Sequence, residues 1–339
     1  MRHPSDWTGV PDMTFQLKAA EPVVDGIRRN VRCEVEKAIE HLGAKVSPRR
    51  RDAWESDAVH EVRKCFKRVR AALRLVREEL GDDAYREENG CFRDAARPLS
   101  EVRDAKMLVE SLDKLSQQCN PDPGAVAKVH AALVANHQEV SRRVLRQGRT
   151  FPAVAEVAAR ALARLSDWKT KDDGLGALEG GVRRVYRAGH RMLSLAAADP
   201  SMANLHEWRK QAKYLWHQLQ LLEPAWTGHE KDLGDRVHRL SQLLGEDHDL
   251  AVLRQTLAAD PLTYGGHGVL KGLFEPLDRR RAELQRLAFE LGRQLYKDSP
   301  KVFASRIATY WRAWAAKVEG ANPGAGSRSA RSARIRSVP

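Results

Sequence analysis

Apolar residues recur every three or four positions along most of the chain, and no segment shows the sustained alternation that marks a strand. This spacing predicts helices, and the glycine and proline residues between them are typical helix breaks. The predicted segments are residues 22–42, from 56 or 57 to 80, 83–97, 99–118, 124–147, 152–168, 200–222, 268–297 and 300–318. We therefore predict an all-α protein.

The order of segments repeats along the chain. The sequence HEVRKCFKRVRAALRLV begins at His60, and a similar sequence, HEWRKQAKYLWHQLQLL, begins at His206. GIRRNVR at 26–32 returns as GVRRVYR at 181–187, and LSEVRDAKML at 99–108 returns as LGEDHDLAVL at 244–253. Repetition in the same order indicates a tandem duplication. We predict a pseudo-two-fold pair of helical bundles, residues 15–168 and 177–318, joined by a linker at 169–176.

The two ends of the chain lack the helical pattern. Residues 1–14 are expected to be irregular, and residues 319–339 are rich in glycine, serine and arginine, a composition typical of disorder. The N-terminal stretch has no apolar run typical of a signal peptide, and no segment has 18 consecutive apolar residues. We expect a soluble, cytoplasmic protein that makes no contact with a membrane.

Each of the two repeated helices carries a basic face opposite an apolar face. A single basic face usually does no more than contact solvent. Two such faces in register, each preceded by a basic helix, instead predict a site for a polyanion. On the repeated helices the predicted site residues are His60, Arg63, Lys64, Lys67, Arg70, Arg74, His206, Arg209, Lys210, Lys213, Tyr214 and His217. On the preceding helices they are Arg28, Arg32, Arg183, Arg187 and Arg191.

The overall charge agrees with an anionic partner. The formal net charge is +13, which favours binding to nucleic acid, a membrane surface or a phosphate polymer. The four cysteines are scattered without the spacing of a zinc site. Arginine offers forked donors to phosphate oxygens and lysine offers a point charge, so helical rows of both suit a chain of phosphates. His60 and His206 would be driven towards the protonated form beside a polyanion.

The paired HxxRKxxK sequences, each preceded by a basic helix and followed by a segment with Asp104 or Asp249, resemble the CHAD family, the conserved histidine α-helical domain. The resemblance covers about residues 15–318. It implies two pseudo-symmetric helical bundles whose basic helices face each other across a central channel. It also implies binding of inorganic polyphosphate and association with polyphosphate granules. In the second repeat Gly245 stands in the place of Ser100.

Two other functions remain open at the level of sequence. A nucleic-acid-binding protein would fit the charge, although the basic faces carry few aromatic residues for base stacking. The arginine-rich tail favours weak, nonspecific binding of nucleic acid. His206, His229 and His248-Asp249 superficially resemble the metal site of a phosphohydrolase. Asp104 and Asp249 are expected to cap helices or pair with basic residues. We expect a non-catalytic polyphosphate-binding protein with no cofactor and no metal ion.

Overall fold

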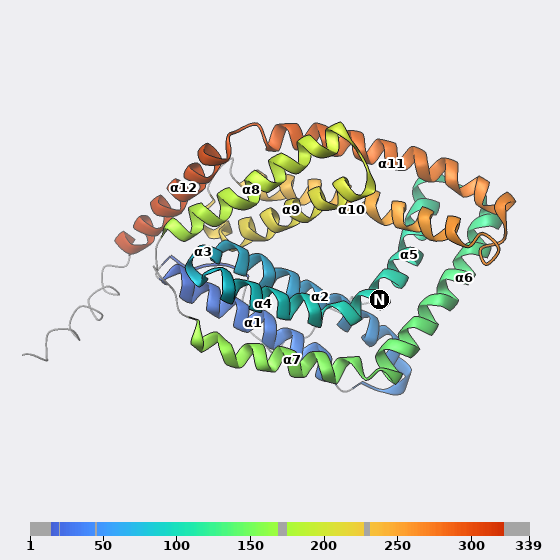
Figure 1. The fold of residues 1–339 in the computed structure, drawn as a ribbon, viewed down its shortest axis with the longest axis horizontal. Coiled ribbons are helices and arrows are strands. Elements are labelled where there is room, and N and C mark those ends of the chain that lie inside the picture. Colours follow the sequence, from blue (N-terminus) through green and yellow to red (C-terminus); the bar gives the residue numbers. More distant parts are fainter. Residues whose placement is uncertain (1–14, 20, 45, 169–174, 227–230, 322–339) are drawn as a thin grey trace, which may run out of the picture.

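The computed structural model describes residues 15–19, 21–44, 46–168, 175–226 and 231–321 (Figure 1). These residues form twelve α-helices and no strand, so the prediction of an all-α fold is confirmed. The first seven helices are α1 Val23–Gly43, α2 Arg51–Leu75, α3 Arg77–Leu80, α4 Asp82–Ala95, α5 Arg97–Cys119, α6 Pro123–Ser141 and α7 Thr150–Arg164. The remaining five are α8 Leu175–Ala198, α9 Met202–Leu221, α10 Lys231–Ala259, α11 His267–Leu295 and α12 Pro300–Ala321.

Several predicted boundaries differ from those of the structure. Helix α2 begins at Arg51, before the predicted start at 56 or 57, because the 3₁₀ turn Pro48–Arg50 leads directly into it. The predicted single helix to residue 80 is interrupted at Val76, which separates α2 from α3. Between α6 and α7, residues Arg142–Gln147 form a π-helix. None of the helices in the described part of the chain has the length and apolar character of a membrane span.

The predicted domain limits fall partly outside the described residues. Of the predicted linker 169–176, residues 169–174 lie outside them, and α8 already begins at Leu175. Helix α12 extends to Ala321, so the first residues of the predicted tail are helical, and 322–339 lie outside the described residues. The same holds for residues 1–14. The pseudo-two-fold relation between the halves stays a prediction.

The helices α1–α7 and α8–α12 contact each other in two regions. In one region α2 and α3 pack against α8 and α9, and in the other α5 and α6 pack against α10 and α11. Figure 1 shows these regions towards opposite ends of the molecule. In the first region a Cβ atom at Gly181 of α8 would overlap the carbonyl oxygen of Leu75. Glycine at this position therefore allows α8 to approach the end of α2.

The apolar faces of α2 and α9 lie in the core. Val62, Phe66 and Val69 of α2 are almost completely buried, as are Trp208 and Leu215 of α9. The ring of Phe66 lies 5.3 Å from that of Phe92, and Trp208 stacks on Phe289 at 5.4 Å. Full burial of such a side chain stabilises the fold by about 1.5–3 kcal/mol. This burial fixes the rotation of both helices, so their basic faces point away from the core.

Candidate functional site

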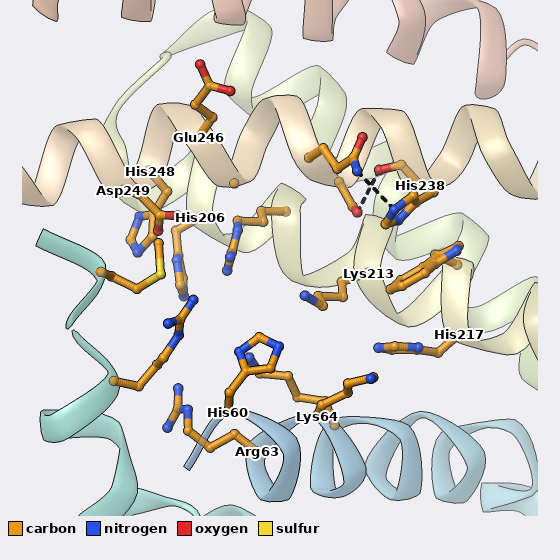
Figure 2. A pocket seen from close by; sticks show the side chains of 18 of the residues that line it. His60, Arg63, Lys64, His206, Lys213, His217, His238, Glu246, His248 and Asp249 are labelled. Carbon is orange, nitrogen blue, oxygen red and sulfur yellow. Dashed lines mark hydrogen bonds between the residues drawn. The ribbon is translucent and has the colours of Figure 1, made fainter. Parts of the chain in front are cut away.

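A cavity of about 830 Å³ lies between the two halves of the molecule. Its walls come from the basic faces of α2 and α9, together with the middle parts of α5 and α10. Figure 2 shows His60, Arg63 and Lys64 rising from α2 on one side, and Lys213 pointing into the same space from the opposite side. The two HxxRKxxK segments therefore contribute to one cavity, although they are far apart in the sequence. We refer to this space as the central cavity.

Eight of the predicted site residues line the central cavity. They are His60, Arg63, Lys64 and Lys67 from α2, and His206, Arg209, Lys213 and His217 from α9. His217 differs from the others because its side chain is buried and its Nδ1 lies 2.9 Å from the amide oxygen of Gln220. Burial lowers the pKa of His217 to about 3, so this ring is a neutral part of the wall at pH 7.

Four other predicted residues of α2 and α9 do not line the central cavity. The guanidinium of Arg74 lies 3.9 Å from the ring centre of Tyr214, a cation–π contact between α2 and α9. Arg70 and Arg74 both donate to the side-chain oxygen of Asn89, at 3.1 and 2.9 Å. Lys210 pairs with Glu207 at 2.7 Å on the same helix. All four thus make contacts within the fold or with a neighbouring carboxylate.

The arginines of the preceding helices also lie away from the central cavity. Arg28 pairs with Asp25 at 2.7 Å and donates to the carbonyl of Trp168. Arg32, Arg187 and Arg191 are exposed, and Arg183 is half-buried. The structure therefore does not bring α1 and α8 arginines into the same site as the HxxRKxxK residues.

The charge of the central cavity is strongly positive. Nine lysine and arginine residues and three carboxylates line it, an excess of six positive charges. One of these carboxylates, Glu246, points away from the cavity in Figure 2 and pairs with Arg280 at 2.7 Å. Asp104 and Asp249 therefore provide the carboxylate charge that faces the cations.

Only some of the cations are neutralised by a carboxylate. Lys64 pairs with Glu61 at 3.0 Å, Arg68 with Glu34 at 3.1 Å, and Arg103 with Glu110 at 3.0 Å. No ion pair within the described residues involves the other six, which we call the unpaired cations. They are Arg63, Lys67, Lys114, Arg209, Lys213 and Arg239.

Comparison with known proteins identifies the family. The sequence model of the CHAD domain matches residues 34–258, more than half of the chain. The protein belongs to the CHAD family. No curated protein matches the chain. The fold is similar to the solved structure of PptA from Streptomyces chartreusis, with a TM-score of 0.56 and 16% sequence identity. The similarity covers 81% of this chain and 100% of that one.

Two lysines of this CHAD protein have strongly lowered pKa values. Burial, together with the nearby Arg209, lowers the pKa of Lys213 to about 8. Burial and the facing ammonium of Lys213 lower the pKa of Lys67 well below its ordinary value. Both shifts have the same physical origin, because each ammonium group leaves water and faces other cations. The carboxylate of Asp249 offsets the shift of Lys213 only in part. The cavity therefore holds positive charge at a cost in free energy.

The cavity histidines are shifted towards their neutral forms. Burial lowers the pKa of both His60 and His206, and burial with the adjacent His206 lowers that of His248 to about 4. The rings of His206 and His248 lie 4.4 Å apart. Protonation of His60 and His206 in a complex with a polyanion therefore stays a prediction. His206 and His248 are among the residues whose sequence resembles the metal site of a phosphohydrolase. His229, which belongs to the same set, lies outside the described residues.

The aspartates of the repeated segments do not cap helices. Asp104 lies within α5 and Asp249 within α10, and both line the cavity, so the capping prediction is wrong. Burial raises the pKa of each carboxyl, while the cation with the largest opposing effect on the pKa is Arg63 for Asp104 and Arg209 for Asp249. Each half thus contributes one carboxylate beside its own arginine.

Ser100 and Gly245 give the two cavity arginines different environments. Arg63 donates to the hydroxyl of Ser100 and, at 3.3 Å, to the carbonyl of Ala96. In the other half, a Cβ atom at Gly245 would lie 3.3 Å from Nε of Arg209. That nitrogen is buried and has no hydrogen-bond partner among the described residues. Nε of Arg63 is likewise buried without a partner, so the two arginines differ at their terminal nitrogens. Arg63 donates two hydrogen bonds there, whereas no hydrogen bond within the described residues involves a terminal nitrogen of Arg209.

Sequence reasoning missed several residues that line the central cavity. These are Arg68 of α2, Arg103 and Lys114 of α5, and His238, Arg239 and His248 of α10. A signal existed for two of them, because Arg103 and His248 immediately precede the repeated aspartates. Arg68 lies within the first repeated sequence, but the partner sequence has Tyr214 in its place. Lys114, His238 and Arg239 stand outside the repeated motifs, and only the packing of α5 and α10 places them beside α2 and α9.

Proposed function

We propose that this CHAD protein binds inorganic polyphosphate in the central cavity and does not catalyse its turnover. The observation that carries the proposal is the set of six unpaired cations, which face one cavity from four helices. A linear phosphate chain presents a negative charge at each unit, so one chain could neutralise cations on both sides of the cavity. Arginine donors in fixed positions and mobile ammonium groups both suit phosphate oxygens.

The aromatic content of the cavity favours a phosphate chain over a nucleic acid. Single-stranded nucleic acids commonly bind through bases that stack on exposed aromatic rings. Among the described lining residues the cavity has one tryptophan, Trp216, and its ring stacks on His238 at 4.1 Å. His217 lies against the same ring at 4.5 Å. The ring is thus engaged with protein side chains, which leaves charge as the main basis of recognition.

The affinity should depend strongly on salt. Each phosphate neutralised by a cation releases bound counterions, and for a single-stranded polyanion the slope of log K against log salt is about 0.7 per contact. Contacts with all six unpaired cations would give a slope of about four. A slope near one would mean that most of these cations do not contact the ligand.

The test compares two quadruple variants that each lose four basic side chains. In the cavity variant, Arg63, Lys67, Arg209 and Lys213 are replaced by alanine; in the control, Arg32, Arg187, Arg191 and Lys210 are replaced. The control residues do not line the central cavity. Long-chain polyphosphate is titrated into each protein at several salt concentrations. We expect the cavity variant to lose most of the affinity and the control to retain it. Equal losses would contradict the proposal.

Two further measurements separate this function from its alternatives. Double-stranded DNA of equal phosphate content should compete poorly with polyphosphate, and effective competition would favour the nucleic-acid function. Incubation of polyphosphate with the protein and divalent metal ions should release no phosphate, and release would identify an enzyme.

We further propose that binding places the protein on cytoplasmic polyphosphate granules. A fluorescent fusion should then co-localise with granules, and the cavity variant should not.

A further inference from the structure

A second, smaller cavity lies next to the central cavity. Its volume is about 340 Å³, and it is bounded by α2, the end of α4 and the beginning of α5. We call it the side pocket. Arg63 and Lys67 line both cavities, so these two side chains form the boundary between them. Phe66 and Arg70 of α2 also line it, and the remaining residues come from α4 and from the α4–α5 corner.

The side pocket also carries an excess of positive charge. Arg63, Lys67, Arg70, Arg93 and Arg97 line it, and one carboxylate, Asp94, accompanies them. Arg93 engages Asp94 with two bonds of 2.9 Å. None of the other four cations has an ion pair within the described residues. The charge pattern thus continues that of the central cavity, and the two cavities share cations rather than being separated by a neutral wall.

Two features of the side pocket favour phosphates over a ligand with an aromatic group. Phe66 and Phe92 line its deeper part, but each is only 1% exposed. Their rings pack against each other at 5.3 Å with a tilt of 57°, so neither offers a free face to a base. The accessible donors are guanidinium groups. Arg97 is exposed, and Arg70 keeps its terminal nitrogens free of any hydrogen bond within the described residues.

We propose that the side pocket binds further phosphates of the chain that occupies the central cavity, so that the polymer leaves this cavity past Arg63 and Lys67. This inference rests on the proposed function. A cation shared by two cavities can contact consecutive phosphates of one chain, which explains why Lys67 stays unpaired among other cations. Chains long enough to reach Arg70 and Arg97 would gain contacts that short oligomers cannot make.

The test uses phosphate oligomers of different lengths. In the side-pocket variant, Arg70→Gln is combined with Arg97→Gln. In the control, Arg160→Gln is combined with Arg279→Gln; both residues are exposed, on α7 and α11, and each pairs with a carboxylate four positions away. Both variants lose two positive charges. Long-chain polyphosphate and tripolyphosphate are titrated into wild type, variant and control at about 50 mM and about 200 mM salt.

We expect the side-pocket variant to bind long chains more weakly than the control, with tripolyphosphate binding unchanged in both. Loss of two contacts should reduce the salt slope for long chains by about 1.4. The ratio of wild-type to variant affinity would then fall about sevenfold between the two salt concentrations. Equal long-chain affinity of the variant and the control would overturn the proposal, as would equal losses for long and short chains.

The experiment separates the failure of this inference from that of the proposed function. Wild-type protein that binds neither polymer would contradict both. Tight wild-type binding with no difference between variant and control would contradict the side pocket alone. Arg70 also donates to the side chain of Asn89, so Arg70→Gln removes a contact within the fold. Thermal unfolding is therefore measured to check that the double variant is folded. The single substitution Arg97→Glu at an exposed position provides an independent measurement, and it should weaken long-chain binding without affecting tripolyphosphate.

Discussion

Binding of polyphosphate should be coupled to uptake of protons by lysine. The pKa of Lys213 is lowered to about 8 because its ammonium group is buried among other cations. A bound phosphate chain would supply the missing anion and raise this pKa towards or above the ordinary lysine value of about 10.4. At pH 8 Lys213 is about half protonated in the free protein and would be fully protonated in the complex. Lys213 alone should therefore take up about half a proton.

The sign of the pH dependence follows from this shift. A group whose pKa rises on binding strengthens binding at low pH and loses that contribution as the pH rises from the free pKa to the bound one. Between about pH 8 and pH 10, each such lysine should increase the dissociation constant by up to about tenfold per pH unit. Lys67 should act in the same direction, because its pKa is also lowered by burial and by Lys213.

Calorimetric titration at pH 8 in buffers with different ionisation enthalpies measures the proton uptake directly. The substitutions Lys213→Arg and Lys67→Arg keep the positive charge, because a guanidinium does not lose its proton in this range. The double variant should bind polyphosphate but take up fewer protons at pH 8 than the wild type, and the remaining uptake should come from the cavity histidines. Equal uptake by the wild type and the double variant would refute the reasoning, because the lysines would then be fully protonated in the free cavity.

Three further predictions concern stability. Lys213→Met should stabilise the free protein at pH 7 by up to about 3 kcal/mol, since a pKa lowered from 10.5 to about 8 penalises the charged form by about 1.4 kcal/mol per unit. In chemical denaturation this gain should disappear above about pH 10.5. The same substitution should weaken polyphosphate binding, because it removes a cation from the cavity. Gly181→Ala should destabilise by about 1–3 kcal/mol through overlap with α2, whereas Gly90→Ala should not, because a Cβ atom added at Gly90 would lie in open space. Arg281→Ala should lower the melting temperature and cost about 3 kcal/mol, because it removes the charged partner of the buried Asp247 at 3.0 Å and leaves only the neutral amide of Gln285 as a donor.

The sequence allowed the orientation of α2 and α9 to be predicted because burial is periodic. The positions that recur every three or four residues, such as Val62, Phe66 and Leu215, are the buried ones. The opposite faces therefore had to be basic and accessible. The ion pairs Glu61–Lys64 and Glu207–Lys210 were also predictable in principle, since a spacing of three places both residues on one helix face.

Contacts between helices could not be predicted in this way. The helical spacing places Arg74 on the same face as Arg63, but α2 runs past the end of the cavity and Arg74 contacts Tyr214 instead. Likewise, the partner of Arg68 is Glu34 of α1, which no periodicity within α2 indicates. A helix pattern gives the direction of a side chain but not the neighbour that it meets.

The unpaired cations and the ion-paired cations have different consequences for the protein. Ion pairs such as Arg68–Glu34 connect two helices. Removal of one partner would leave the other charge buried and unpaired. Lys67 and Lys213 form no ion pair within the described residues, and burial makes their charged forms unfavourable. A fold under selection for stability alone would favour apolar residues at these positions. The free-energy cost of burying these two ammonium groups is offset only when an anion enters the cavity. The two lysines therefore destabilise the free protein and strengthen the binding of an anion.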